Sequence, residues 1–171
     1  LRTSVGICAT ATLLAACGGG SGGDNAGGGG DSEYVDGGTF TMSMAGDPGK
    51  LDPQSSASTQ LFTVNQLAYD NLVSVDAKTG EIQSQLATDW KVDGKTVTLT
   101  LGKGITCADG SDFTATAVAD NIAYVGDPKN KSPYLGTFLP VGATAKADDA
   151  AGTVTITLAQ PAPSVLNGLA S

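Results

Sequence analysis

The stretch that decides the fold is Trp90-Lys91-Val92-Asp93-Gly94-Lys95-Thr96-Val97-Thr98-Leu99-Thr100-Leu101. Its second half alternates threonine with valine or leucine, which is the period of a strand with one buried face. Between the halves, Asp93-Gly94 favours a type I′ turn, because both residues tolerate the positive φ that this turn needs. We therefore expect an antiparallel hairpin over 90–101, with Trp90 at a core position.

Further elements are expected on both sides of the hairpin. Strands are predicted at 38–44, 72–75, 143–147 and 153–158. Apolar residues spaced three and four apart predict two helices, one over 58–71 and one that begins after Thr114 and ends at 126–128. Ser58 or Thr59 is the expected cap of the first helix, and Thr114 of the second.

Glycine and proline mark turns and helix starts in the rest of the chain. Asp109-Gly110 predicts a turn, and Pro163 predicts the start of a last helix. The resulting order of strand, helix, hairpin, helix and hairpin is not a regular β-α-β alternation. The sequence therefore predicts an α+β fold, with a mostly antiparallel sheet and a few packed helices.

The N-terminus carries a different kind of signal. Leu14-Ala15-Ala16-Cys17 closes a short apolar run and resembles a bacterial lipoprotein signal. The resemblance implies that residues 1–16 are removed and that Cys17 is acylated, which anchors the protein to membrane lipid on the extracytoplasmic face. The apolar run is too short to span a bilayer as a helix.

A glycine-rich segment follows Cys17. Residues 18–32 contain nine glycines and no apolar side chain larger than alanine, so this segment cannot bury enough surface to order itself. We expect 17–32 to form the lipidated cysteine and a flexible linker, and 33–171 to form the folded domain.

Charge and composition exclude several functions. The formal net charge is −8, so nucleic acid is not an expected partner. The chain has no histidine, so it can form neither a histidine-dependent nucleophile nor a histidine-containing zinc site. Neither a cofactor nor catalysis is expected. The acidic pairs Asp109/Asp112 and Asp148/Asp149 are interpreted as solvated turn residues.

The number of cysteines left in the mature domain is odd, so one thiol has no partner. Cys8 would leave with the signal and Cys17 would be acylated, so Cys107 is alone in the mature domain. It is either an inert buried residue or a residue whose partner is missing.

A set of short motifs resembles one protein family in order and spacing. The motifs are Gly37-Gly38-Thr39-Phe40, Leu51-Asp52-Pro53, Tyr69-Asp70-Asn71-Leu72-Val73, Leu86-Ala87-Thr88-Asp89-Trp90, Asp93-Gly94-Lys95-Thr96, Asp109-Gly110 and Phe113-Thr114-Ala115. They resemble the extracellular solute-binding proteins of family 5, the oligopeptide, dipeptide and nickel type that supply ABC importers. The resemblance runs from about Gly37 to Ala170.

The resemblance implies a two-lobed fold of the periplasmic-binding-protein type, of which this chain covers part of the first lobe. It also implies a peptide or another small solute as ligand and ABC permease subunits as partners. Two segments map onto residues near the ligand in such relatives. One is the turn of Gly46, Asp47, Pro48 and Gly49, and the other is Ser132-Pro133-Tyr134, which offers Tyr134. A plain Pro-Gly turn and an ordinary packing role for Tyr134 remain the alternatives.

The family context changes the interpretation of Cys107, since a disulfide partner beyond Ser171 becomes the favoured explanation. We expect the lipid-anchored substrate-binding component of an ABC importer. The alternative is a small surface lipoprotein with a structural or protein-interaction role, and an extracellular hydrolase is a third candidate.

Overall fold

The structure is a computed structural model that describes residues 37–170. The chain divides into two units, Leu1–Thr41 and Met42–Ser171, and the fold described below is that of the second. The predicted lipidation site at Cys17, the signal over 1–16 and the linker over 17–32 lie outside the described residues.

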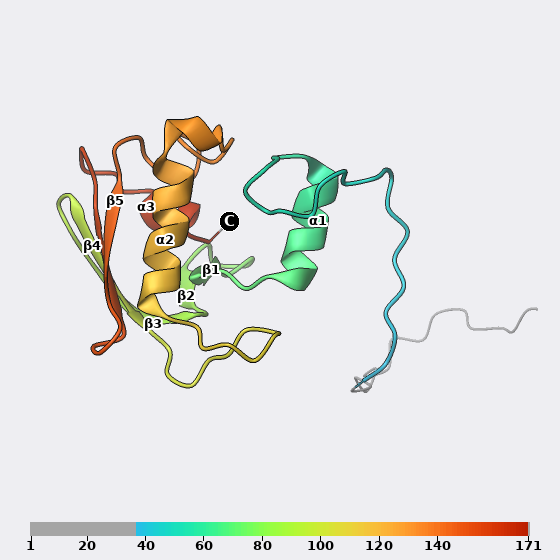
Figure 1. The fold of residues 1–171 in the computed structure, drawn as a ribbon, viewed down its shortest axis with the longest axis horizontal. Helices are drawn as coiled ribbons and strands as arrows, with labels where there is room; N and C mark the ends of the chain where they lie inside the picture. Colours follow the sequence, from blue (N-terminus) through green and yellow to red (C-terminus); the bar gives the residue numbers. More distant parts are fainter. Residues whose placement is uncertain (1–36, 171) are drawn as a thin grey trace, which may run out of the picture. The chain divides into compact units, whose positions relative to one another are not determined.

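The core of the fold is a four-stranded antiparallel sheet (Figure 1). Its strands are β3 (Ala87–Asp93), β4 (Thr96–Leu101), β5 (Thr144–Asp148) and β6 (Thr153–Thr157), in the order β3-β4-β6-β5. Alternate residues of β4 and β6 are buried, and Val97 pairs with Ile156 while Leu99 pairs with Val154. The predicted hairpin and the predicted α+β class with an antiparallel sheet are confirmed.

The turn of the hairpin differs from the prediction by one residue. Asp93 still pairs with Thr96, so the two-residue loop is Gly94-Lys95 rather than Asp93-Gly94. Gly94 has a φ of 59°, whereas Lys95 does not have positive φ. One positive φ at the first loop position is the pattern of a type II′ turn, which spares lysine the left-handed conformation that type I′ would impose.

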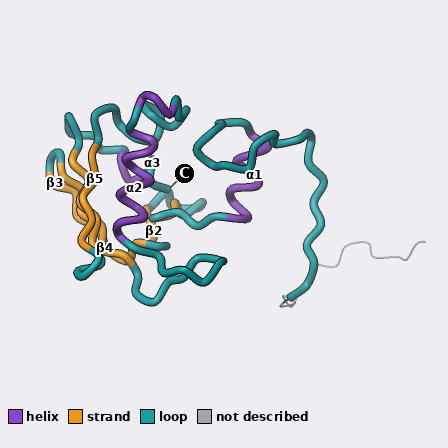
Figure 2. Tube along the Cα trace, in the orientation of Figure 1, coloured by secondary structure: helices purple, strands orange, loops and turns teal. Residues whose placement is uncertain are grey.

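Helix α2 (Ala115–Gly126) lies along one face of this sheet and packs against β5 and β6 (Figures 1 and 2). Thr114 caps it as predicted, accepting a hydrogen bond from the Ala117 backbone at 3.1 Å. Its buried face consists of Ala115, Val118, Ile122 and Val125. The helix ends before Asp127-Pro128, where a 3₁₀ turn, η1 (Pro128–Asn130), begins.

A second, two-stranded sheet joins β1 (Val73–Val75) to β2 (Ile82–Ser84) in antiparallel fashion. A two-stranded sheet alone is marginally stable in water. Here the fully buried side chain of Val73 belongs to the main core, and the Ala87 backbone nitrogen donates to the Leu72 carbonyl at 2.7 Å. The small sheet is therefore part of the same folded body.

Two helical predictions were too long or began too early. Helix α1 (Thr59–Ala68) is capped by Ser58 but stops short of Asn71, because Tyr69 is already extended, with φ −131° and ψ 144°. Helix α3 (Val165–Gly168) begins after Pro163.

No helix among residues 37–170 is long and apolar enough to cross a membrane.

The strand predicted at 38–44 is not formed. Its alternation of polar and apolar residues is present, but no strand of the described chain pairs with it. Without a partner, the backbone groups cannot enter a hydrogen-bonded ladder. Met42 is accordingly 40% exposed.

Candidate functional site

The predicted ligand residue Tyr134 lies in a cluster of three aromatic rings. Phe62, from α1, lies 6.1 Å from Tyr134 between ring centroids, with an angle of 29° between the ring planes. Phe138 lies 5.1 Å from Tyr134 at 87° and 6.1 Å from Phe62 at 73°. Offset and edge-to-face arrangements at these separations are favourable. The Tyr134 ring thus packs on two other rings but remains only partly buried, and its place beside the ligand stays a prediction.

Polar contacts hold the Leu51-Asp52-Pro53 loop against this cluster. The Ser132 hydroxyl, two residues before Tyr134, donates to the Gln54 carbonyl at 3.1 Å. The Gln54 side-chain amide also donates to the side-chain oxygen of Asn121 on α2. The loop is thereby tied both to the Ser-Pro-Tyr segment and to the helix that covers the sheet.

The Tyr134 hydroxyl stays protonated near neutral pH. Burial raises its pKa above 10.0, and the negative charge of Asp52 acts in the same direction, while a hydrogen bond with the Asn65 side chain opposes them. A protonated phenol can donate a hydrogen bond to a bound solute.

Asn65 adds an unused acceptor to the cluster. Its Oδ1 atom is buried and has no hydrogen-bond partner among the described residues. Buried side-chain oxygens rarely remain unpaired in folded proteins, so such an atom calls for an explanation. An acceptor of this kind suits a ligand that brings an N–H or O–H donor.

The second predicted segment, Gly46–Gly49, forms a turn beside another part of α1. The Asp47 carboxylate accepts from the Gly49 backbone at 2.7 Å, and Gly49 has a φ of 76°. A Cβ atom on Gly46 would lie 3.7 Å from Nε2 of Gln60. Helix α1 thus contacts Tyr134 through Phe62 and has Gln60 on the side that faces Gly46.

A shallow groove continues from the Gly46 turn. Its volume is about 160 Å³, and it lies between the extended chain at 42–45 and the first half of α1, at Thr59, Gln60 and Thr63. The lining is mostly apolar, because Met42 and Met44 contribute to it. We keep Gly46, Asp47, Pro48 and Gly49 as proposed ligand neighbours on this side of the helix.

Sequence reasoning missed three of the residues around Tyr134, namely Phe62, Asn65 and Phe138. Phe62 and Asn65 stand three residues apart, which places them on the same side of a helix. That spacing was available in the sequence, but their meeting with Tyr134 depends on tertiary packing.

Three members of the acidic pairs, Asp109, Asp148 and Asp149, accept turn or capping hydrogen bonds. Asp109 accepts from the backbone and hydroxyl of Ser111, which lowers its pKa below 3.8, the hydroxyl having the larger effect. Asp149 accepts from the hydroxyl and backbone nitrogen of Thr116 at 2.6 and 2.8 Å, and these bonds likewise lower its pKa. It is a second cap on α2 that the sequence analysis did not foresee. No cluster of three possible metal-binding side chains occurs among the described residues.

Cys107 is exposed and has no disulfide partner within residues 37–170. It lies in the turn around Gly110, where its backbone nitrogen donates to the Ser111 carbonyl at 2.8 Å. Exposure does not fit the interpretation of Cys107 as a buried inert residue. The predicted pairing with a cysteine beyond Ser171 stays a prediction.

Comparison with known proteins shows which sequences this chain resembles. Residues 81–171 match the model of the bacterial extracellular solute-binding proteins, family 5, middle region. The glutathione-binding protein GsiB of Salmonella choleraesuis (strain SC-B67) is 34% identical over 122 residues, which is 70% of this chain and 23% of that protein. The chain thus spans about a quarter of the length of this relative.

Solved structures agree with the sequence match. A substrate-binding protein from Microbacterium hydrocarbonoxydans, solved with 4-hydroxybenzoate hydrazide, is 35% identical, with a TM-score of 0.62 over 70% of this chain and 25% of its own. The murein tripeptide-binding protein MppA of Escherichia coli is 28% identical, with a TM-score of 0.63 over 71% of this chain and 27% of its own. The expected binding-protein fold is confirmed, and the chain belongs to the family 5 bacterial extracellular solute-binding proteins.

Proposed function

We propose that this chain is part of the substrate-binding component of an ABC importer. The component captures a peptide or another small solute outside the cell and delivers it to the membrane permease. Family membership supports this role, as do the names of two relatives, one a glutathione-binding protein and the other a murein tripeptide-binding protein. The family is one of binding proteins rather than enzymes.

The observation that carries the proposal is the surface around Tyr134. It combines three aromatic rings, a protonated phenol and the unpaired Oδ1 atom of Asn65. Aromatic rings offer an apolar surface to a solute, and a few fixed polar groups set its orientation. Asp52 adds negative charge near the phenol. The surface therefore favours a neutral or cationic part of the solute with a hydrogen-bond donor.

This proposal is tested by calorimetry on the longest protein encoded by the reading frame that contains this chain. A mixture of two- to five-residue peptides is titrated first, and its binding members are then titrated singly. We expect saturable binding, and we expect Asn65→Leu to weaken it about tenfold, because the solute donor then loses its acceptor. Leu67→Ala, at an exposed position of the same helix, is the control. The site is refuted if the Asn65 variant binds as tightly as the control.

We also propose that the protein is held at the membrane by acyl chains on Cys17. The Leu14-Ala15-Ala16-Cys17 motif and the glycine-rich segment behind it support this anchor. Cys17→Ser should release the protein from the membrane fraction, since a serine oxygen cannot take the place of the acylated thiol. Equal membrane association of wild type and variant would contradict the proposal.

For Cys107 we propose a disulfide with a cysteine beyond Ser171 in the complete protein. Its exposure in the described part of the chain supports this pairing, because an exposed thiol is accessible to a partner. Mass spectrometry of the unreduced mature protein tests it directly. A free thiol at Cys107 would rule the disulfide out.

A further inference from the structure

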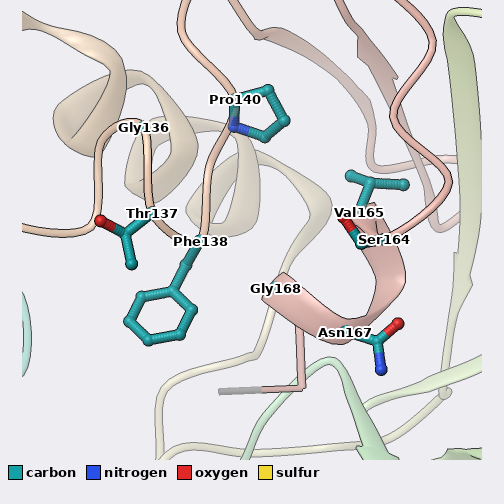
Figure 3. A pocket seen from close by; sticks show the side chains of 8 residues that line it. All are labelled: Gly136, Thr137, Phe138, Pro140, Ser164, Val165, Asn167 and Gly168. Carbon is teal, nitrogen blue, oxygen red and sulfur yellow. The ribbon is translucent and has the colours of Figure 1, made fainter.

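A second hollow lies next to the aromatic cluster. Its volume is about 390 Å³, and its walls are residues 136–140, which follow Tyr134, and residues 164–168, which form α3 and its cap (Figure 3). This volume is at the lower end of the range for small-molecule pockets. Phe138 belongs both to this wall and to the aromatic cluster, so the pocket directly adjoins the proposed solute site.

Both walls are held in place by hydrogen bonds. The Tyr134 carbonyl accepts from the backbone nitrogens of Thr137, Phe138 and Leu139 at 3.2, 2.9 and 3.0 Å. On the other wall, the Gly168 nitrogen donates to the Ser164 carbonyl at 3.2 Å. These bonds fix the local backbone of each wall, and a wall that needs little ordering lowers the cost of binding.

The two walls meet at Gly168. A Cβ atom at this position would collide with the carbonyl oxygen of Phe138. Only glycine allows the two backbones to approach this closely. Val165, which is 2% exposed, fixes the same wall in the main core.

The lining has a distinctive chemistry. Its side chains carry no ionisable group, and the Phe138 ring and Pro140 supply apolar surface. Thr137 and Ser164 are exposed, and the Ser164 hydroxyl makes no capping hydrogen bond to α3. In Figure 3, Thr137 and Phe138 stand on one side, and Ser164 and Val165 on the other.

We infer that this pocket is a subsite for an uncharged, hydrogen-bonding side group of the solute, such as a carboxamide or an alcohol. A charged group would lose water there without gaining a partner of opposite charge, which is costly. An uncharged amide or alcohol can pair with the two hydroxyls while its carbon atoms pack on Phe138 and Pro140. The inference rests on the proposed function, because it assigns the pocket to the solute that contacts Tyr134.

Three capped amino acids test the charge preference on the longest protein encoded by the reading frame that contains this chain. The probes are the N-acetyl methylamides of glutamine, glutamate and lysine, added at neutral pH to ¹⁵N-labelled protein and followed by amide chemical shifts. We expect the glutamine probe to shift the amides of Thr137, Ser164 and Gly168. We expect the other two probes to bind at least about tenfold more weakly.

Variants test the two hydroxyls. The double variant Thr137→Val with Ser164→Ala should bind the glutamine probe about tenfold more weakly, since two hydrogen bonds are lost. Thr157→Val, at an exposed position of β6, is the matched control and should stay within about twofold of wild type. Amide spectra of each variant report whether it is folded.

Several outcomes would overturn the inference. These are equal binding of all three probes, no shift at the walls of the pocket, or equal affinity of the double variant and the control. If the probes do not distinguish the pocket but Asn65→Leu still weakens solute binding, only this inference is refuted. If Asn65→Leu also has no effect on solute binding, the proposed function is refuted as well.

Discussion

Gly94 in the β3–β4 turn gives the sharpest test of how the central hairpin is built. We consider Gly94→Val, which puts a β-branched residue at a φ of 59°. No atom lies within 4 Å of the Cβ that the substitution adds. The added Cβ therefore has open space around it, and backbone strain is the main expected cost of the substitution.

The magnitude follows from two opposing effects. A strained backbone conformation of this kind costs about 1–3 kcal/mol. Replacing glycine also restricts the unfolded chain, which returns about 0.4–1 kcal/mol. The net loss of unfolding free energy is about 1–2 kcal/mol, or roughly 4–8 °C in melting temperature for a domain of this size.

Thermal unfolding followed by circular dichroism measures this effect, with Gly94→Asn as the matched control. Asparagine tolerates positive φ better than other non-glycine residues, so its variant should melt between wild type and Gly94→Val. The reasoning is refuted if the valine variant melts with the wild type, or if the asparagine variant melts as low as the valine variant.

Three further predictions concern the core, the second cap of α2 and solute binding. Leu99→Ala, at a fully buried position of β4, should lower the unfolding free energy in urea by about 2–5 kcal/mol, whereas Leu67→Ala, at a 64% exposed position, should change it by less than about 0.5 kcal/mol. The pKa of Asp149 is lowered from 3.8 in the fold, so its contribution to stability is present above pH 3.8 and is lost as the pH falls through the lowered value. In Asp149→Asn, the unfolding free energy should therefore fall less steeply as the pH is lowered below about 3.8. The same steepness in variant and wild type would exclude this cap. The 171-residue chain alone should bind peptides weakly or not at all, and a saturable ligand of micromolar affinity in calorimetry would show that it contains a complete site.

Local patterns predicted most of the fold. The alternation at 96–101 and the cap at Thr114 are properties of neighbouring residues, and both were placed correctly. The turn was one residue off, because pairing of Asp93 with Thr96 decided which residues form the loop. The segment 38–44 shows the converse case, in which a strand-like pattern has no partner strand among the described residues.

The candidate site was less accessible to sequence reasoning. Tyr134 was recognised through a family resemblance, yet its contacts with Phe62 and Asn65 join segments that are far apart in the chain. The bond from Thr116 to Asp149 likewise spans 33 residues. No periodicity encodes such meetings, which arise when α1 and the β5–β6 turn pack against the rest of the fold.

A crystal structure of the longer protein with its bound solute tests the central claim most directly, because the claim is one of location. The account predicts that the solute lies in van der Waals contact, within about 4 Å, of the Tyr134 ring, and that a donor of the solute faces Oδ1 of Asn65. A solute bound elsewhere, in contact with none of Phe62, Tyr134 and Phe138, would contradict it.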